Sequence, residues 1–171
     1  MHLDWSYRND AKKRVRVPSE LRTLIRRLLP HEVSQVIGLG KAMVEEIGGI
    51  PGGFNAAVFE STWSALLQVG LGIILVSQEK DESFSSAIGG VIGPDLNNGM
   101  LCFSETFFFS GTNNGWNGIK LIKELENTLK EIGVKLIYMN SLHNDKATDR
   151  VGRLYELKGY RKYGYSYTKS L

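Results

Sequence analysis

The sequence RLYELKGY, residues 153–160, closes a short amphipathic segment near the end of the chain. The helical pattern begins around Arg150 and runs to Lys158, where Gly159 supplies the stop signal that commonly follows a helix. An aromatic residue, Tyr160, comes directly after this glycine. The sequence therefore predicts a helix over residues 150–158.

Strand and helix patterns alternate on both sides of this helix. Residues 100–109 are rich in aromatic and apolar side chains, and residues 136–139 form a short apolar run, so both segments predict strands. Between them, residues 115–132 have apolar positions at helical spacing and charges on the other side. After the last helix, residues 161–169 alternate aromatic and polar side chains, which predicts a final strand.

The first half of the chain changes from a helical period to a strand period. Apolar spacing predicts helices over residues 21–29, 31–47 and 54–69. Residues 73–77 and 87–92 are then short apolar runs separated by a charged turn, which predicts an antiparallel hairpin.

This order of elements predicts an α/β (α+β) fold with a mixed sheet. Helices precede a three-stranded meander, and strand–helix–strand units follow it. A right-handed crossover between residues 100 and 139 places the start of the long helix at the carboxyl edge of the sheet. Anions bind at such a position.

Size and composition favour a single folded domain. The chain has 171 residues, 42% hydrophobic and 23% charged, and none of its apolar runs approaches the roughly 18 residues of a membrane span. Cys102 is the single cysteine, so neither a disulfide nor a metal site is predicted. We expect a protein of a reducing, cytoplasmic compartment that does not enter the membrane.

The turn before the long helix has the composition of a phosphate-binding loop. Residues 110–119 read SGTNNGWNGI and lead from a predicted strand directly into the helix. Free backbone N–H groups and the helix dipole attract anions there, and glycine allows close approach. A plain loop with a helix cap is the alternative interpretation.

The 153–160 segment resembles the "lYeklGF" signature of the GNAT (GCN5-related N-acetyltransferase) superfamily, with Tyr160 in the aromatic position. The resemblance covers residues 31–171, and the helical part around residues 38–46 is similar to phage-encoded members. It implies a mostly antiparallel sheet whose fourth and fifth strands splay apart. Residues 1–30 would then be a separate basic segment.

The resemblance implies acetyl-CoA as cosubstrate, bound at the turn and by backbone groups of the fourth strand. The family pattern overlays Asn113, Trp116 and Gly118, but Asn113 replaces a long donor and Trp116 replaces a glycine. Backbone amides can still bind phosphate there. The implied coenzyme-binding residues are Phe107, Phe108, Phe109, Asn113, Asn114, Gly115, Trp116, Asn117, Gly118 and Asn144.

Two residues are candidates for catalysis. Tyr155 overlays the family tyrosine that protonates the departing thiolate; the alternative is that it only packs in the helix. Glu105, an isolated carboxylate in the apolar fourth strand, matches the family glutamate that removes a proton from the amine. Strand residues alternate, so Glu105 points either into a functional cleft or to solvent.

The implied function is N-acyl transfer to an amine of a small molecule or protein. The alternative is a GNAT-fold protein that no longer catalyses and acts as a binding or assembly subunit, for example in a phage particle. Basic residues concentrated before residue 30 predict either a solvated helix face or a contact with an acidic protein or nucleic acid. A homo-oligomer in a bacterial or phage-infected cell is compatible with both functions.

Overall fold

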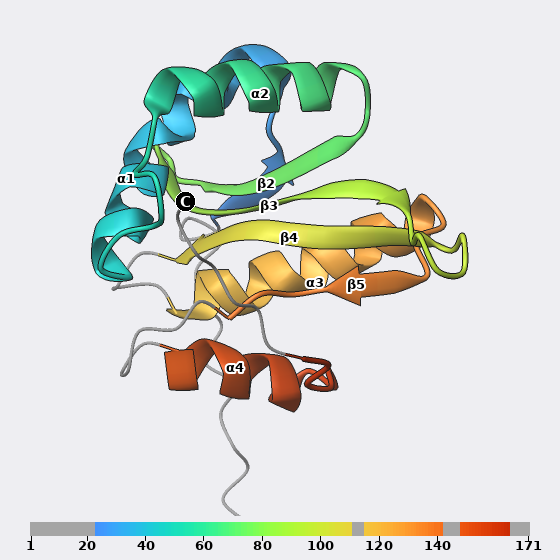
Figure 1. Ribbon diagram of the computed structural model, residues 1–171. Coiled ribbons are helices and arrows are strands. Elements are labelled where there is room, and N and C mark those ends of the chain that lie inside the picture. Colours follow the sequence, from blue (N-terminus) through green and yellow to red (C-terminus); the bar gives the residue numbers. More distant parts are fainter. Residues whose placement is uncertain (1–22, 111–114, 142–147, 165–171) are drawn as a thin grey trace, which may run out of the picture.

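The computed structural model describes residues 23–110, 115–141 and 148–164, which form a five-stranded sheet covered by helices on both faces (Figure 1). The strands lie in the order in which they occur in the chain. Their bounds are β1 Leu24–Arg27, β2 Gly72–Gln78, β3 Phe84–Pro94, β4 Leu101–Ser110 and β5 Leu136–Tyr138. Strands β1 to β4 are antiparallel and β5 is parallel to β4, which confirms the predicted mixed, mostly antiparallel sheet.

Four α-helices and one 3₁₀ helix accompany the sheet in the described part of the chain. Figure 1 shows α1 and α2 on one side of the sheet and α3 and α4 on the other. Their bounds are η2 Pro30–Val36, α1 Ile37–Glu46, α2 Ala56–Gln68, α3 Gly115–Glu131 and α4 Thr148–Leu157. The helices predicted over residues 54–69, 115–132 and 150–158 are therefore confirmed.

The helix predicted over residues 21–29 is wrong, because residues 24–27 form the edge strand β1. Ile25 packs against the main core, and the Arg26 side chain donates from Nε to Gln78 Oε1 on β2 at 2.7 Å. Pairing with β2 and the partial burial of Ile25 outweigh the helical spacing of the leucines. Part of the predicted basic segment thus belongs to the sheet.

The single helix predicted over residues 31–47 is divided into η2 and α1. The first turns are a 3₁₀ helix that begins at Pro30. Arg26 binds Glu32 in this segment through two N···O contacts of 2.7 Å, which ties η2 to β1. The predicted end at Gly48 and Gly49 is confirmed, since both glycines have positive φ angles after α1.

The final strand predicted over residues 161–169 is not found in residues 161–164, which are exposed and have no regular secondary structure. The rest of this prediction lies outside the described residues. Alternating polarity does not supply the neighbouring strand that a ladder of hydrogen bonds requires.

Two hydrophobic cores lie on opposite faces of the sheet. The first contains the apolar side of α3 and the sheet residues that face it, and Tyr155 of α4 completes it. The second lies between the sheet and the segments η2, α1 and α2, with Trp63 against the Phe107 ring at a centroid distance of 5.3 Å. Strand β4 contributes an aromatic ring to each core, Phe103 to the first and Phe107 to the second.

A β-bulge reverses the direction of β4 side chains between these two aromatic residues. Gly89 pairs with Phe107 and Gly90 pairs with Glu105, so Thr106 is the extra residue of the bulge. A Cβ atom on Gly90 would collide with the carbonyl oxygen of Ser104 and with the Phe103 ring. The bulge therefore depends on glycine in the facing strand.

We expect Gly90→Ala to lower the free energy of unfolding by about 1–3 kcal/mol, the usual cost of overpacking a well-filled site. The collision is with backbone as well as ring atoms, so the sheet itself must move. Gly93→Ala is the matched control in the same strand, because a Cβ there meets nothing within 4 Å. Urea denaturation measures both variants, and equal stability of the two would contradict the prediction.

Candidate functional site

Strands β4 and β5 separate close to the middle of β4. Their parallel pairing covers three positions and ends where Ser104 faces Tyr138. Immediately beyond, Asn140 lies between the two strands and bonds to Glu105, its backbone N–H donating to Oε2 at 2.6 Å and its side-chain amide to the backbone carbonyl. The predicted splaying of the fourth and fifth strands is therefore confirmed.

Glu105 is a buried carboxylate at the point of separation. Only 3% of the residue is exposed, and it follows Phe103 by two positions on the strand face that contacts α3 and α4. Removal from water raises its pKa from the ordinary range to about 7, although the N–H group of Asn140 opposes the change. Glu105 thus points into the molecule, not toward solvent, and can exchange a proton near neutral pH.

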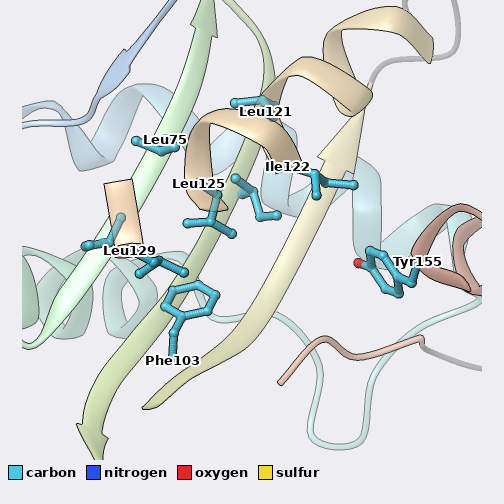
Figure 2. Close-up of a cluster of buried hydrophobic side chains, with 9 residues drawn as sticks. Leu75, Phe103, Leu121, Ile122, Leu125, Leu129 and Tyr155 are labelled. Carbon is cyan, nitrogen blue, oxygen red and sulfur yellow. The ribbon is translucent and has the colours of Figure 1, made fainter. Parts of the chain in front are cut away.

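Tyr155 extends from α4 toward the same region. Figure 2 shows its ring beside Ile122 of α3, with the hydroxyl group leading away from α4. The residue is 5% exposed, and its Oη has no hydrogen-bond partner among the described residues. Burial raises the pKa of the phenol, and the negative charge of Glu105 raises it further. The structure therefore brings the two predicted catalytic residues into one buried site.

The bulge also sets which backbone groups of β4 face β5 and which face β3. The carbonyl of Glu105 points toward β5, where it accepts the Asn140 amide. Backbone groups alternate along a strand, and the extra residue at the bulge shifts the alternation by one position. Consequently Phe108 directs its N–H group toward the opening, whereas Phe107 and Phe109 direct theirs toward β3.

The start of α3 approaches the end of β4 closely. A Cβ atom on Gly118 would lie 3.0 Å from the Ser110 Oγ and 3.1 Å from the Phe108 ring, so only glycine fits without displacement. Asn117 is buried, and its amide lies 3.5 Å from the Thr23 Oγ1 at the entry to β1.

Of the remaining predicted coenzyme-binding residues, some lie within the described part of the chain and others lie outside it. Gly115 and Trp116 form the first turn of α3, as the loop-to-helix pattern predicted. Asn113, Asn114 and Asn144 lie outside the described residues.

Sequence reasoning missed Asn140. It follows the short strand β5 in a segment without a recognisable motif, and its contact with Glu105 joins positions 35 residues apart. The family resemblance implies a different asparagine, Asn144, which lies outside the described residues. A signal that distinguishes the two residues does not exist in a single sequence.

The arrangement combines the buried Glu105 carboxylate, the buried Tyr155 hydroxyl and the Phe108 N–H group, close to the N-terminus of α3. Such a set can transfer protons and hold a polarised carbonyl group. The described residues contain no cluster of three or more His, Cys, Asp or Glu side chains suited to a metal ion. None of the helices in the described ranges combines the length and apolar character needed to cross a bilayer.

The raised pKa of Glu105 predicts a stability change with pH. Between about pH 4.5 and 7 the folded protein binds a proton that the unfolded chain has released, so the free energy of unfolding falls as pH rises. Glu105→Gln removes this dependence. The quantity to compare is the free energy of unfolding of the variant minus that of the parent. We expect this difference to be about 3 kcal/mol larger at pH 8 than at pH 4.

Denaturation at a series of pH values measures this difference. Glu124→Gln, on the exposed side of α3, is the control for the loss of one carboxylate. A pH dependence of the same size in both variants would refute the assignment to Glu105.

The fold of this chain, but not its sequence, matches known proteins. No family model matches the sequence, and comparison with curated proteins gave no match. Solved structures do match over almost the whole chain. A predicted acetyltransferase from Clostridium acetobutylicum, solved with acetyl-CoA, is 15% identical with a TM-score of 0.70, covering 87% of this chain and 96% of that one.

Two further structures extend the comparison. An aminoglycoside acetyltransferase from an uncultured soil metagenomic sample is 13% identical with a TM-score of 0.69, covering 88% of this chain and 99% of that one. Ribosomal-protein-alanine N-acetyltransferase from Brucella melitensis biovar Abortus is 15% identical with a TM-score of 0.61, covering 86% and 99%. Together with the order of strands and the separation of β4 from β5, these matches show that the chain has the fold of the GNAT acetyltransferases.

Proposed function

We propose that this chain is an N-acetyltransferase that transfers an acetyl group from acetyl-CoA to an amine of a small molecule or protein. The observation that carries the proposal is the joint burial of Glu105 and Tyr155 where β4 and β5 separate. A strongly desolvated acid and an unpaired buried hydroxyl are costly to stability, and such groups concentrate at functional sites.

The residues present suit this cosubstrate. The unpaired Tyr155 hydroxyl is a donor available to a ligand, and the Phe108 N–H group faces the opening between the strands. Gly118 lets the start of α3 approach β4 closely, where the helix dipole favours phosphate. Acetyl-CoA would supply an acyl group activated as a thioester.

Glu105 is suited to the role of general base. Attack by an amine requires its neutral form, so the ammonium group must lose a proton, directly or through water. A carboxylate with a pKa of about 7 is substantially ionised at neutral pH and still basic enough to accept that proton. Its second oxygen, Oε1, is the atom left for this role, because Oε2 accepts the Asn140 N–H group.

Tyr155 is suited to the role of general acid. Its Oη–H group can donate a proton to a departing thiolate, whose conjugate acid has a pKa of about 8.5. The raised phenol pKa keeps this proton in place until negative charge develops nearby. The Phe108 N–H group would stabilise the charge on the carbonyl oxygen.

The basic N-terminal segment remains a predicted contact site for anions. Residues 1–22 contain six Lys or Arg and three Asp or Glu, so they carry the entire net charge of +3. They join the described structure at Thr23, which contacts Asn117 in the first turn of α3. Coenzyme phosphate, an acidic protein or nucleic acid could each be attracted there.

Calorimetry of the full chain with CoA and acetyl-CoA tests the cosubstrate. We expect saturable binding of both ligands, because the backbone donors at α3 remain although Asn113 and Trp116 depart from the family pattern. Absence of binding at millimolar ligand would overturn the enzyme proposal. A stoichiometric partner that co-purifies without CoA would instead support a binding or assembly subunit.

Kinetics of Glu105→Gln and Tyr155→Phe test the two roles. We expect each substitution to lower kcat by about 10²–10⁴-fold, the usual contribution of a general base or acid, with acetyl-CoA affinity changed far less. In the parent, kcat/KM should rise with pH to a plateau above pH 7. Release of free thiol with a panel of amines measures turnover, and an unchanged kcat in either variant would remove that residue from its role.

A further inference from the structure

Asn140 holds Glu105 at two separate points. Its backbone N–H donates to the carboxylate at Oε2, and its side-chain amide donates to the Glu105 backbone carbonyl. The first bond orients the end of the side chain, and the second fixes the strand from which that side chain projects. Among the described residues, Asn140 is the one hydrogen-bond donor to the Glu105 carboxylate.

The position of Asn140 explains why the two strands stay apart without losing contact. Regular pairing ends at Ser104 and Tyr138, and the amide of Asn140 takes the place that the next β5 backbone N–H group would occupy. Asn140 is exposed to solvent, whereas the Glu105 residue that it contacts is only 3% exposed. Asn140 lies at the boundary between the opening and the buried base.

Few other groups act on this carboxylate. From α4, Tyr155 is the titratable group that faces it, and its hydroxyl makes no hydrogen bond among the described residues. From β3, the paired residue is Gly90, which carries no side chain. Among the described residues, no cation lowers the pKa of Glu105. The N–H group of Asn140 is the polar contact that favours the charged carboxylate.

We infer that Asn140 is the positioning residue of the general base: it fixes the Glu105 carboxylate by Oε2, presents Oε1 to the reacting amine and limits the entry of water. The inference rests on the proposed role of Glu105 as base. Asn140 acts through Glu105, so its effect must appear in the titration of that carboxylate as well as in turnover.

Two substitutions are expected to move the titration of Glu105 in opposite directions. Asn140→Ala leaves room for water beside the carboxylate, which favours the charged form, so the midpoint should fall below 7 by about 1. Asn140→Asp keeps the shape but removes the amide donor and adds a negative charge, so the midpoint should rise by about 1.

Infrared or carbon-13 NMR spectroscopy of the carboxyl group, assigned with Glu105→Gln, measures both midpoints in the full chain without ligand. The matched controls are Asn127→Ala and Asn127→Asp on the exposed side of α3, which make the same chemical changes away from Glu105. They should leave the midpoint unchanged. Thermal melts establish that each variant is folded.

Turnover gives the second readout. We expect both Asn140 variants to lower kcat at least tenfold with little change in the KM for acetyl-CoA, and to have no further effect in the Glu105→Gln background. A purely structural role would lower activity without opposite changes in the titration. If neither Asn140 variant moves the midpoint, or both move it in the same direction, the inference is overturned.

The outcomes separate this inference from the proposed function. If the parent protein neither binds nor turns over acetyl-CoA while the two variants still move the Glu105 titration in opposite directions, Asn140 keeps its positioning role and the acetyltransferase proposal fails. If the parent is active and the titration does not respond, the acetyltransferase proposal stands and the role of Asn140 is disproved.

Discussion

The separation of β4 from β5 at Glu105 is the constraint on which the rest of the structure depends. A sheet gains stability from continuous pairing, yet here the ladder ends after three positions and Asn140 replaces the next backbone donor with its side chain. The separation leaves backbone groups of β4 without the β5 partners that a regular sheet would supply. The same contact holds a carboxylate in a place that water barely reaches.

The bulge at Thr106 determines which side chains of β4 face each core. Before the bulge, β4 directs Phe103 and Glu105 into the core beside α3, and after it Phe107 fills the opposite core against Trp63. Because of this one extra residue, the same strand places an aromatic ring in each of the two cores. It also supplies the buried Glu105 carboxylate and a backbone N–H group that faces the separation of β4 and β5. The arrangement requires glycine on β3, because the Phe103 and Phe107 rings occupy the space of any side chain there.

The site places polar groups where burial is costly. The Tyr155 hydroxyl has no partner among the described residues, and Glu105 has a pKa of about 7 because desolvation exceeds the effect of its hydrogen bond. Burying an unpaired hydroxyl or a carboxylate reduces stability by about 1–3 kcal/mol or more. A protein that buries both groups in one region gives up stability for a chemical property, which is the pattern expected of proton transfer.

The sequence by itself determined the meander, the long helix α3, the helix before Gly159 and the identity of Glu105 and Tyr155 as candidates, because these depend on local periodicity and on a short signature. Tertiary structure alone decided the rest. Residues 24–27 became a strand because β2 offers a partner, and Phe108, not its neighbours, directs an N–H group inward because of the bulge. Asn140 could not be predicted, since its role arises from contact with a residue 35 positions away, and a single sequence carries no record of such a contact.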